Sequence, residues 1–409
     1  MKLPALFKNS YFLVPLLILV IYITRFRFDK THYFDLLADA FLHGRLNIIP
    51  RQHLQDLVLF NGKYYLYWPP VPAVMMMPFV ALFGPNLPDA IISSLIGAVN
   101  VWLFMKIITQ LSTRFLLDIR LSEIIWAGLF WGLGTVHFYM AANGDVWHFS
   151  QVTAQLFLLS AVYFFLQNSR WWQSGLFFAL AVYTRNDLVF SGIFFLFLYF
   201  GINRDQAIAK AIKPAMQFIL PFMICSILNL WYNEARFGSM TDNGLDHHLM
   251  SAYFKPDFMK YGFFSWHYFP HNFYTEVMHW PSIIRHDPFI REEPEGFGFI
   301  WASPFFLWLI PAIGLYVYLM VTRSSWRRYR IICTGSLLAA IPIAITIFLI
   351  MGTGWRQFAA RYTLDFQFFL LIFLLFSWPY LRRIPYARQI SMIMIVCAVI
   401  IQYIGAANN

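Results

Sequence analysis

Three carboxylate side chains lie close together just after the first long apolar segment of the chain. Asp29, Asp35 and Asp39 fall within eleven residues, where the chain is expected to leave a lipid bilayer. A carboxylate at a lipid boundary is partly desolvated, which raises its pKa and suits it to accept a proton. Asp35 and Asp39 also have a simpler interpretation, because a spacing of four residues places both on the water-facing side of an amphipathic helix over residues 33–42. Asp29 precedes this helix and is expected nearer the membrane.

Asp145 is another acidic candidate, and it lies within residues 143–148 between two apolar segments. Asp145 occupies a turn at the expected outer edge of the membrane, where an ionisable residue is costly unless it is paired or wetted. This cost makes Asp145 a candidate catalytic residue. Asp145 is an equally good candidate for a helix cap, since its carboxylate can accept backbone N–H groups at the start of the next helix.

Several arginines at the expected outer edge could hold an anionic group. Arg185 needs an anionic partner, and either Asp187 or a lipid-linked phosphate could supply it. The planar fork of a guanidinium suits phosphate oxygens, which favours the phosphate. Arg236 has a simpler partner in Glu234 or in lipid headgroups. The further candidates for an anionic lipid carrier are Arg236, Arg356 and Arg361.

Six of the eleven histidines lie in residues 233–299, which raises the hypothesis of a metal site. Their spacing does not support it, because Pro270 separates His267 from His271 and spoils a shared helical face. The surrounding aromatic residues are typical of an interfacial belt or of sugar stacking. The sequence therefore predicts neither a metal site nor a cofactor.

The composition of the chain indicates which structural elements hold these candidate residues in place. The chain has 409 residues, of which 59% are hydrophobic and 12% charged, whereas soluble proteins carry about 25% charged residues. Apolar stretches long enough to cross a bilayer recur along the chain. The sequence predicts an all-α, polytopic membrane protein whose net charge of +10 reflects membrane orientation and not nucleic-acid binding.

Eleven segments are expected to cross the membrane, and one further apolar segment is not. Residues 64–84 contain four prolines and are expected to form an interfacial or re-entrant helix. The first crossing is interpreted as a retained span and not as a signal peptide. The expected crossings are 11–28, 89–111, 122–141, 149–166, 171–184, 188–202, 214–232, 301–322, 331–351, 361–378 and 389–405.

Loop charge predicts how these segments are oriented. The expected inner segments carry sixteen basic residues against three acidic ones, and basic residues concentrate in cytoplasmic loops. The N-terminus is therefore expected inside and the C-terminus outside. The chain divides into a seven-span module over 1–232 with a first external loop at 29–70, a large external loop at 233–299, and C-terminal helices over 300–409. External loops of this length usually carry function.

The first external loop contains, in order, residues 29–33, an amphipathic helix, Gly44, Pro50, residues 61–65 and the Pro69-Pro70 pair. This order resembles the first loop of the GT-C superfamily of membrane glycosyltransferases, which use polyprenyl-phosphate sugars and include lipid A aminoarabinose transferases and protein O-mannosyltransferases. Members of the superfamily have seven opening spans, two juxtamembrane helices in the first external loop and a large loop after span seven. The membrane topology predicted from loop charge gives the same order of spans and loops.

The resemblance implies roles for individual residues. Asp29 matches the catalytic aspartate, and Asp145 matches a second aspartate of similar enzymes. His32 and Trp68 stand where a relative has phosphate-binding arginine and lysine, so Lys63 or an arginine elsewhere is expected to take over. The candidate substrate-binding residues are His32, Tyr33, Asp35, Asp39, Lys63, Arg185, Arg236, Arg356 and Arg361.

The function expected from this resemblance is an inverting glycosyl transfer at the outer face of the cytoplasmic membrane. The donor would be a sugar on a polyprenyl phosphate, the acceptor an envelope glycan, lipid or protein, and Asp29 the general base. Such a donor needs no nucleotide site and no cofactor. A secondary transporter or flippase for a lipid-linked or anionic solute is the alternative, since charged residues within membrane segments also occur in transporters.

Overall fold

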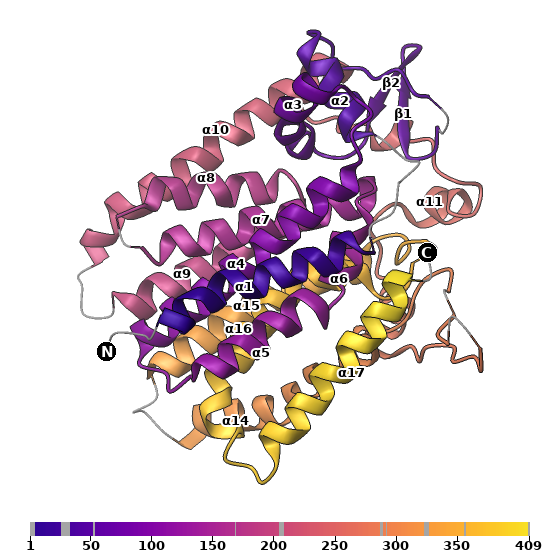
Figure 1. Cartoon of the computed structure of the whole chain (residues 1–409). Coiled ribbons are helices and arrows are strands. Elements are labelled where there is room, and N and C mark those ends of the chain that lie inside the picture. The colour runs from indigo at the N-terminus through magenta and orange to yellow at the C-terminus, as the bar shows by residue number, and fades with distance from the viewer. Residues whose placement is uncertain are drawn as a thin grey trace.

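The computed structural model describes residues 5–25, 33–51, 54–167, 169–203, 208–286, 289–291, 293–322, 327–355 and 357–407. These residues form a bundle of α-helices with a small β-hairpin at one end (Figure 1). The prediction of a mainly α-helical chain is confirmed.

Helices cover most of each predicted apolar segment. The apolar composition explains this, because a backbone in lipid must satisfy its own hydrogen bonds. The bundle consists of α1 (Ala5–Ile23), α4 (Asp89–Phe115), α5 (Leu121–Leu133), α6 (His137–Asn143), α7 (Val146–Phe165), α8 (Trp171–Val182), α9 (Ser191–Ile202), α10 (Ile212–Phe237), α14 (Leu309–Thr322), α15 (Arg327–Leu349), α16 (Leu364–Leu381) and α17 (Ala387–Ala407).

The lengths of these helices indicate a multi-pass membrane protein. Within the described residues, six helical segments are long and apolar enough to cross a membrane. A seventh is added if α5 and α6, which meet at a bend of 54°, count as one span. Four further apolar helical segments, residues 9–23, 71–83, 171–182 and 186–202, have only 10–17 residues each. Helix α7 has 20 residues but is not among the segments apolar enough to count as a span.

Buried hydrogen bonds support the break between α5 and α6. The Tyr22 hydroxyl donates to the carbonyl of Gly132 at 2.6 Å, and the Thr135 hydroxyl donates to the carbonyl of Trp131 at 2.7 Å. His137 opens α6 with its Nδ1 atom 3.1 Å from the same Tyr22 hydroxyl. The carbonyls freed by the break therefore keep hydrogen-bond partners inside the apolar bundle.

The first external loop contains helix α2 (Phe34–Leu42), strands β1 (Leu57–Phe60) and β2 (Lys63–Leu66), and helix α3 (Val71–Phe83). The helix expected over residues 33–42 is confirmed as α2. The helix expected over residues 64–84 is wrong at its start, because residues 64–66 belong to β2. Asn61 and Gly62 both have positive φ, of 50° and 72°. Such a pair forms the tight turn that joins two antiparallel strands.

The second external loop lies against the first. It contains η3 (Leu245–His247), α11 (Lys255–Tyr261), α12 (Phe269–Phe273) and η4 (Tyr274–Met278), followed by α13 (Phe299–Ala302) and η5 (Pro304–Trp308). The backbone N–H of Leu249 donates to the carbonyl of Leu57 at 2.7 Å, and the N–H of Asp56 donates to the carbonyl of Leu249 at 3.1 Å. Figure 1 shows α2, α3, the hairpin and α11 together at one end of the bundle.

Candidate functional site

A cavity of about 890 Å³ lies where the two external loops meet the ends of the bundle helices. Both loops contribute to its wall, as do the ends of α7, α8, α10 and α15. The lining residues belong to the segments 55–56, 67–70, 145–148, 184–190, 229–236, 243–254, 263–264, 346–355 and 361–362. Four of the predicted site residues line it, namely Asp145, Arg185, Arg236 and Arg361.

Asp145 caps helix α7. Its Oδ1 atom accepts the backbone N–H of His148 at 3.0 Å and lies 2.7 Å from the Nδ1 atom of His148. Burial by itself raises the pKa of Asp145, but His148 and Arg361 outweigh it and hold the pKa below its usual value. The helix-cap interpretation is therefore confirmed. Asp145 brings a persistent negative charge to the cavity, which orients neighbouring groups better than it accepts a proton.

The backbone turn before Asp145 depends on a glycine. Gly144 has a φ of +87°, and a Cβ atom at this position would overlap the backbone N and Cα atoms of Ala90. We predict that Gly144→Ala lowers the apparent melting temperature in detergent strongly, since left-handed strain of about 1–2 kcal/mol adds to a backbone clash.

Gly238→Ala is the matched control for this substitution. Gly238 is also left-handed, with a φ of +71°, but a Cβ atom there would meet open space. This variant should therefore lose only the free energy of the left-handed strain. Equal melting temperatures for the Gly144 and Gly238 variants in the same thermal scan would contradict the close approach of Gly144 to α4.

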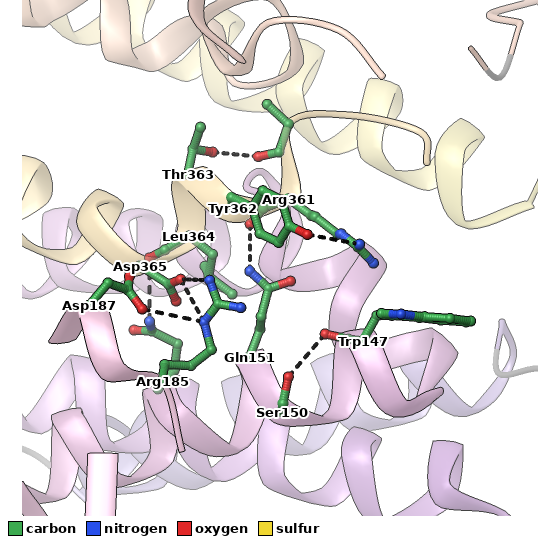
Figure 2. Close-up of polar contacts among 12 residues, drawn as sticks. Trp147, Ser150, Gln151, Arg185, Asp187, Arg361, Tyr362, Thr363, Leu364 and Asp365 are labelled. Atoms are coloured by element: carbon green, nitrogen blue, oxygen red, sulfur yellow. Dashed lines mark hydrogen bonds and ion pairs between the residues drawn. The ribbon is translucent and has the colours of Figure 1, made fainter. Parts of the chain in front are cut away.

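Arg185 lines the cavity but binds carboxylates of the protein itself (Figure 2). Its Nη2 atom donates to Oδ2 of Asp365 at 2.6 Å, and its Nε atom lies 3.0 Å from the same oxygen. Oδ1 of Asp187 is 3.6 Å from the Arg185 Nε atom. The sequence identified Asp187 as a partner and missed Asp365, which lies 180 residues further along the chain. Two carboxylates compete here with an external phosphate.

Arg361 is buried, and its backbone is held by α7. The segment η7 (Arg361–Thr363) begins with this residue. The Gln151 side chain donates to the carbonyl of Arg361 at 3.0 Å, and that of Gln155 donates to the carbonyl of Leu364 at 3.3 Å. Figure 2 shows Gln151 reaching from α7 to this segment. Helix α7 therefore fixes where the arginine enters the cavity.

The Arg361 guanidinium has no carboxylate within ion-pair distance among the described residues. Its Nη2 atom contacts the Tyr362 hydroxyl at 3.3 Å, and its Nε atom has no hydrogen-bond partner in that part of the chain. The guanidinium carbons of Arg361 and Arg185 lie 5.0 Å and 5.3 Å from the centre of the Tyr362 ring. A buried cation with an unused donor is suited to an anionic ligand.

Arg236 is a second buried guanidinium on the cavity wall. Its Nη1 atom donates to the carbonyl of Leu66 at 3.1 Å, and its Nη2 atom donates to Oδ1 of Asn233 at 2.9 Å. Its guanidinium carbon lies 3.8 Å from the centre of the Tyr232 ring. The alternative pairing with Glu234 is wrong, because Glu234 is exposed and forms no ion pair with Arg236 in the described structure. Neutral partners leave the positive charge of Arg236 available to a ligand.

Asp56 is a cavity carboxylate that the sequence analysis missed. Its Oδ2 atom accepts the indole N–H of Trp147 at 3.1 Å, and its Oδ1 atom lies 3.5 Å from Nε2 of His248. The Asp56 backbone has a φ of +63°, a left-handed conformation that Asp adopts more readily than most residues and that forms the turn before β1. The Asn61-Gly62 turn was the available signal, since it predicts a hairpin whose first strand starts just after Asp56.

Other predicted residues of the first external loop lie outside the cavity lining. The Tyr33 hydroxyl donates to the carbonyl of Gln55 at 2.7 Å, which places Tyr33 behind the wall. Asp39 pairs with Arg45 at 3.1 Å, and Lys63 is exposed at the hairpin turn. Lys63 is thus in no position to replace a phosphate contact of this cavity.

Asp35 does not face water as one interpretation of the sequence predicted. It is fully buried in α2, and its Oδ1 atom accepts the backbone N–H of Leu36 at 2.8 Å. The water-facing interpretation of Asp35 is therefore wrong. The face of α2 that carries Asp35 packs inward because its neighbours Phe34 and Leu37 are also buried. Asp29, His32 and Arg356 lie outside the described residues.

Aromatic side chains form much of the remaining wall. The rings of Tyr253 and Trp355 lie 4.6 Å apart, and both are partly exposed. Trp68 lies 6.5 Å from Trp147 across the same cavity lining. Aromatic faces with polar edges bind the apolar faces of sugars well. Trp266 and Trp280, which belong to the expected aromatic belt, are exposed elsewhere.

The histidines of the second external loop mainly face carboxylates. His271 lies 2.6 Å from Glu295, and His279 lies 3.4 Å from Glu293. In the described portion of the chain, no three His, Cys, Asp or Glu side chains are grouped so as to hold a metal ion.

Glu276 is a buried carboxyl group near this site. It is fully buried in η4, and neither of its carboxyl oxygens has a hydrogen-bond partner among the described residues. Burial raises the pKa of Glu276 well above its usual value of 4.5, although Arg361 acts in the opposite direction. The folded protein therefore holds this proton at a pH where the unfolded chain has lost it.

We predict that this proton makes the stability depend on pH. Below pH 4.5 the group is protonated in both states, and above it the folded state becomes less stable relative to the unfolded one, by about 1.4 kcal/mol per unit of pKa difference. Glu276→Gln should match the wild type at low pH and melt about 2 °C or more higher at pH 8. Glu234→Gln, at an exposed position, is the control. If the melting temperatures of the wild type and Glu276→Gln change in parallel between pH 4 and pH 8, the raised pKa of Glu276 does not affect stability and the prediction is wrong.

Comparisons with known proteins add no assignment to this geometry, since no family model, no curated protein and no solved structure matches the chain.

Proposed function

We propose that this protein is a glycosyltransferase that moves a sugar from a polyprenyl-phosphate donor to an envelope glycan, lipid or protein. The observation that carries the proposal is the combination of charges in one cavity. Two buried guanidiniums without carboxylate partners among the described residues, Arg236 and Arg361, share its lining with the carboxylate of Asp56. Arginines bind phosphate oxygens, and a carboxylate can assist attack by a hydroxyl group.

The reaction follows from these charges. The acceptor hydroxyl loses its proton to a carboxylate while its oxygen forms a bond to the anomeric carbon of the sugar. The bond between that carbon and the phosphate oxygen breaks, and the electron pair leaves with the polyprenyl phosphate. Arginines stabilise the negative charge that grows on the phosphate. Direct attack inverts the configuration at the anomeric carbon.

Two carboxylates have separate roles in this proposal. Asp29 is the general base, as the resemblance to GT-C enzymes implies. Asp56 stabilises the positive charge that develops on the sugar ring, since the transition state of glycosyl transfer resembles an oxocarbenium ion. Its hydrogen bond from Trp147 keeps the Asp56 carboxylate in place on the cavity wall. Asp145 holds the start of α7, which carries Trp147 and Gln151.

The membrane arrangement belongs to the same proposal. The eleven crossings expected from the sequence, with α5 and α6 together forming one of them, cross the cytoplasmic membrane, with the N-terminus inside and the cavity facing the periplasm or the cell exterior. The support is the charge asymmetry of the loops together with the position of both external loops at one end of the bundle (Figure 1).

Proteoliposomes containing a labelled lipid-linked sugar test the proposal. The donors are a panel of undecaprenyl-phosphate hexoses and pentoses labelled in the sugar, and a membrane extract supplies the acceptors. We expect the label to leave the polyprenyl-phosphate donor and to appear on an acceptor, which can itself be a lipid, while unlabelled polyprenyl phosphate appears. If the label instead crosses the bilayer still attached to its lipid, the protein is a flippase. If neither process occurs with any donor of the panel, the proposal fails.

A further inference from the structure

A second cavity, of about 320 Å³, lies at the other end of the α5–α6 pair. The chain starts α5 at Leu121 beside this cavity and finishes α6 just before Asp145, which lines the first cavity. The wall of the second cavity is almost entirely apolar and comes from α4, α5, η5, α16 and α17. Trp126, Phe130, Trp308 and Leu374 are among its lining residues. Such a wall suits a hydrocarbon chain.

The mouth of this cavity is charged. Glu123 lies there and accepts hydrogen bonds from the Trp378 indole at 3.0 Å and from Nη1 of Arg382 at 3.0 Å. Asp118 binds the other end of the Arg382 guanidinium. Arg382 therefore uses its donors on two carboxylates of the protein.

The other two arginines at the mouth keep unused donors. Arg388 Nε lies 3.6 Å from Glu123, which is too far for a hydrogen bond, and it has no other hydrogen-bond partner among the described residues. The exposed side chain of Arg120 forms no ion pair in the same part of the chain. Three arginines thus face two carboxylates, which leaves an excess of one positive charge beside an apolar cavity.

We propose that this cavity binds an anionic phospholipid of the inner leaflet, with one acyl chain inside and the phosphate at Arg120 and Arg388. The mouth belongs to the segments 106–120 and 382–388, whose basic excess predicts a cytosolic position. Basic pockets between membrane helices on that side bind the headgroups of anionic lipids. The polyprenyl-phosphate donor is assigned to the first cavity, whose arginines Arg236 and Arg361 lie at the opposite end of the bundle. The lipid site does not depend on the proposed transfer reaction.

Native mass spectrometry of the full chain, purified and mixed with phosphatidylglycerol or phosphatidylcholine, tests the lipid site. We expect the wild type to retain phosphatidylglycerol at least about tenfold better than phosphatidylcholine, as charge-assisted hydrogen bonds imply. The double variant Arg120→Gln/Arg388→Gln should lose this preference. Arg383→Gln is the control, since Arg383 lies in the same loop but not at the cavity.

A second variant tests the acyl chain. Ala127→Trp should fill the cavity that Ala127 lines and reduce retention of both lipids, whereas Ile310→Trp on the exposed face of α14 should not. The arginine variants alter exposed or half-exposed side chains, so they are expected to fold. They therefore still test the lipid site if Ala127→Trp fails to fold. Equal retention of the two lipids, no response to the arginine variants, or full competition by inorganic phosphate would overturn the proposal.

Discussion

Replacing Asp29 by asparagine is expected to lower kcat for sugar transfer about 100- to 10,000-fold, the usual contribution of general base catalysis. Asparagine keeps the size of the side chain and removes its ability to accept the proton. The Kd for the lipid-linked donor, measured by equilibrium binding, should change only slightly. Full activity of Asp29→Asn would remove this residue from the role of base.

The companion substitution Asp56→Asn is expected to lower kcat less, by about 10- to 100-fold, a typical effect for one electrostatic contact to the transition state. The Trp147 indole can still donate to the amide oxygen of asparagine, so the local structure should persist. Asp39→Asn is the matched control, because Asp39 belongs to the same loop and pairs with Arg45 outside the cavity lining. Unchanged kcat in Asp56→Asn would separate the observed cavity from the chemistry.

Substituting glutamine for Arg361 or Arg236 is expected to weaken donor binding about 10- to 100-fold in each case. A charge-assisted hydrogen bond contributes about 1.5–3 kcal/mol, and both guanidiniums face the cavity without a carboxylate partner among the described residues. The measurement is the Kd for undecaprenyl phosphate in nanodiscs. Lysine at either position should restore part of the affinity, because it keeps the charge and loses the fork.

Two controls separate this effect from loss of structure. Arg285→Gln alters an exposed arginine of the same external loop outside the cavity lining and should leave the Kd unchanged. Arg185→Gln should instead lower the melting temperature, because Asp365 would be left buried without its partner. Unaltered Kd values in both Arg361→Gln and Arg236→Gln would contradict a phosphate site formed by these arginines.

The helical architecture could be predicted from local sequence alone. Each expected crossing segment is rich enough in apolar residues to favour a helix, and helices cover most of each segment. The breaks within them, such as the bend of 54° between α5 and α6, could not be predicted in this way. Helix α2 was also predictable from its amphipathic pattern. The hairpin at residues 57–66 was missed although the Asn61-Gly62 turn indicates it, because the apolar run after it favoured a single helix.

The site was predicted only in part, because long-range pairing assembles it. Asp56 reaches the cavity through backbone pairing between Leu57 and Leu249, almost two hundred residues apart. Arg361 is placed by a hydrogen bond from Gln151, and Arg185 by an ion pair with Asp365. No local pattern specifies such partners. The charged residues at the expected outer edge of the membrane could be recognised in the sequence, whereas their partners could not.

Photoaffinity labelling most directly tests the central claim that this cavity holds a lipid-linked phosphate. The probe is an undecaprenyl phosphate with a diazirine close to the phosphate, added to the protein in nanodiscs, and labelled peptides are mapped by mass spectrometry. The account predicts labelling in residues 229–236, 346–355 and 361–362, which contribute to the cavity lining, and reduced labelling in Arg361→Gln. Labelling confined to segments outside the lining, or unchanged in Arg361→Gln, would contradict it.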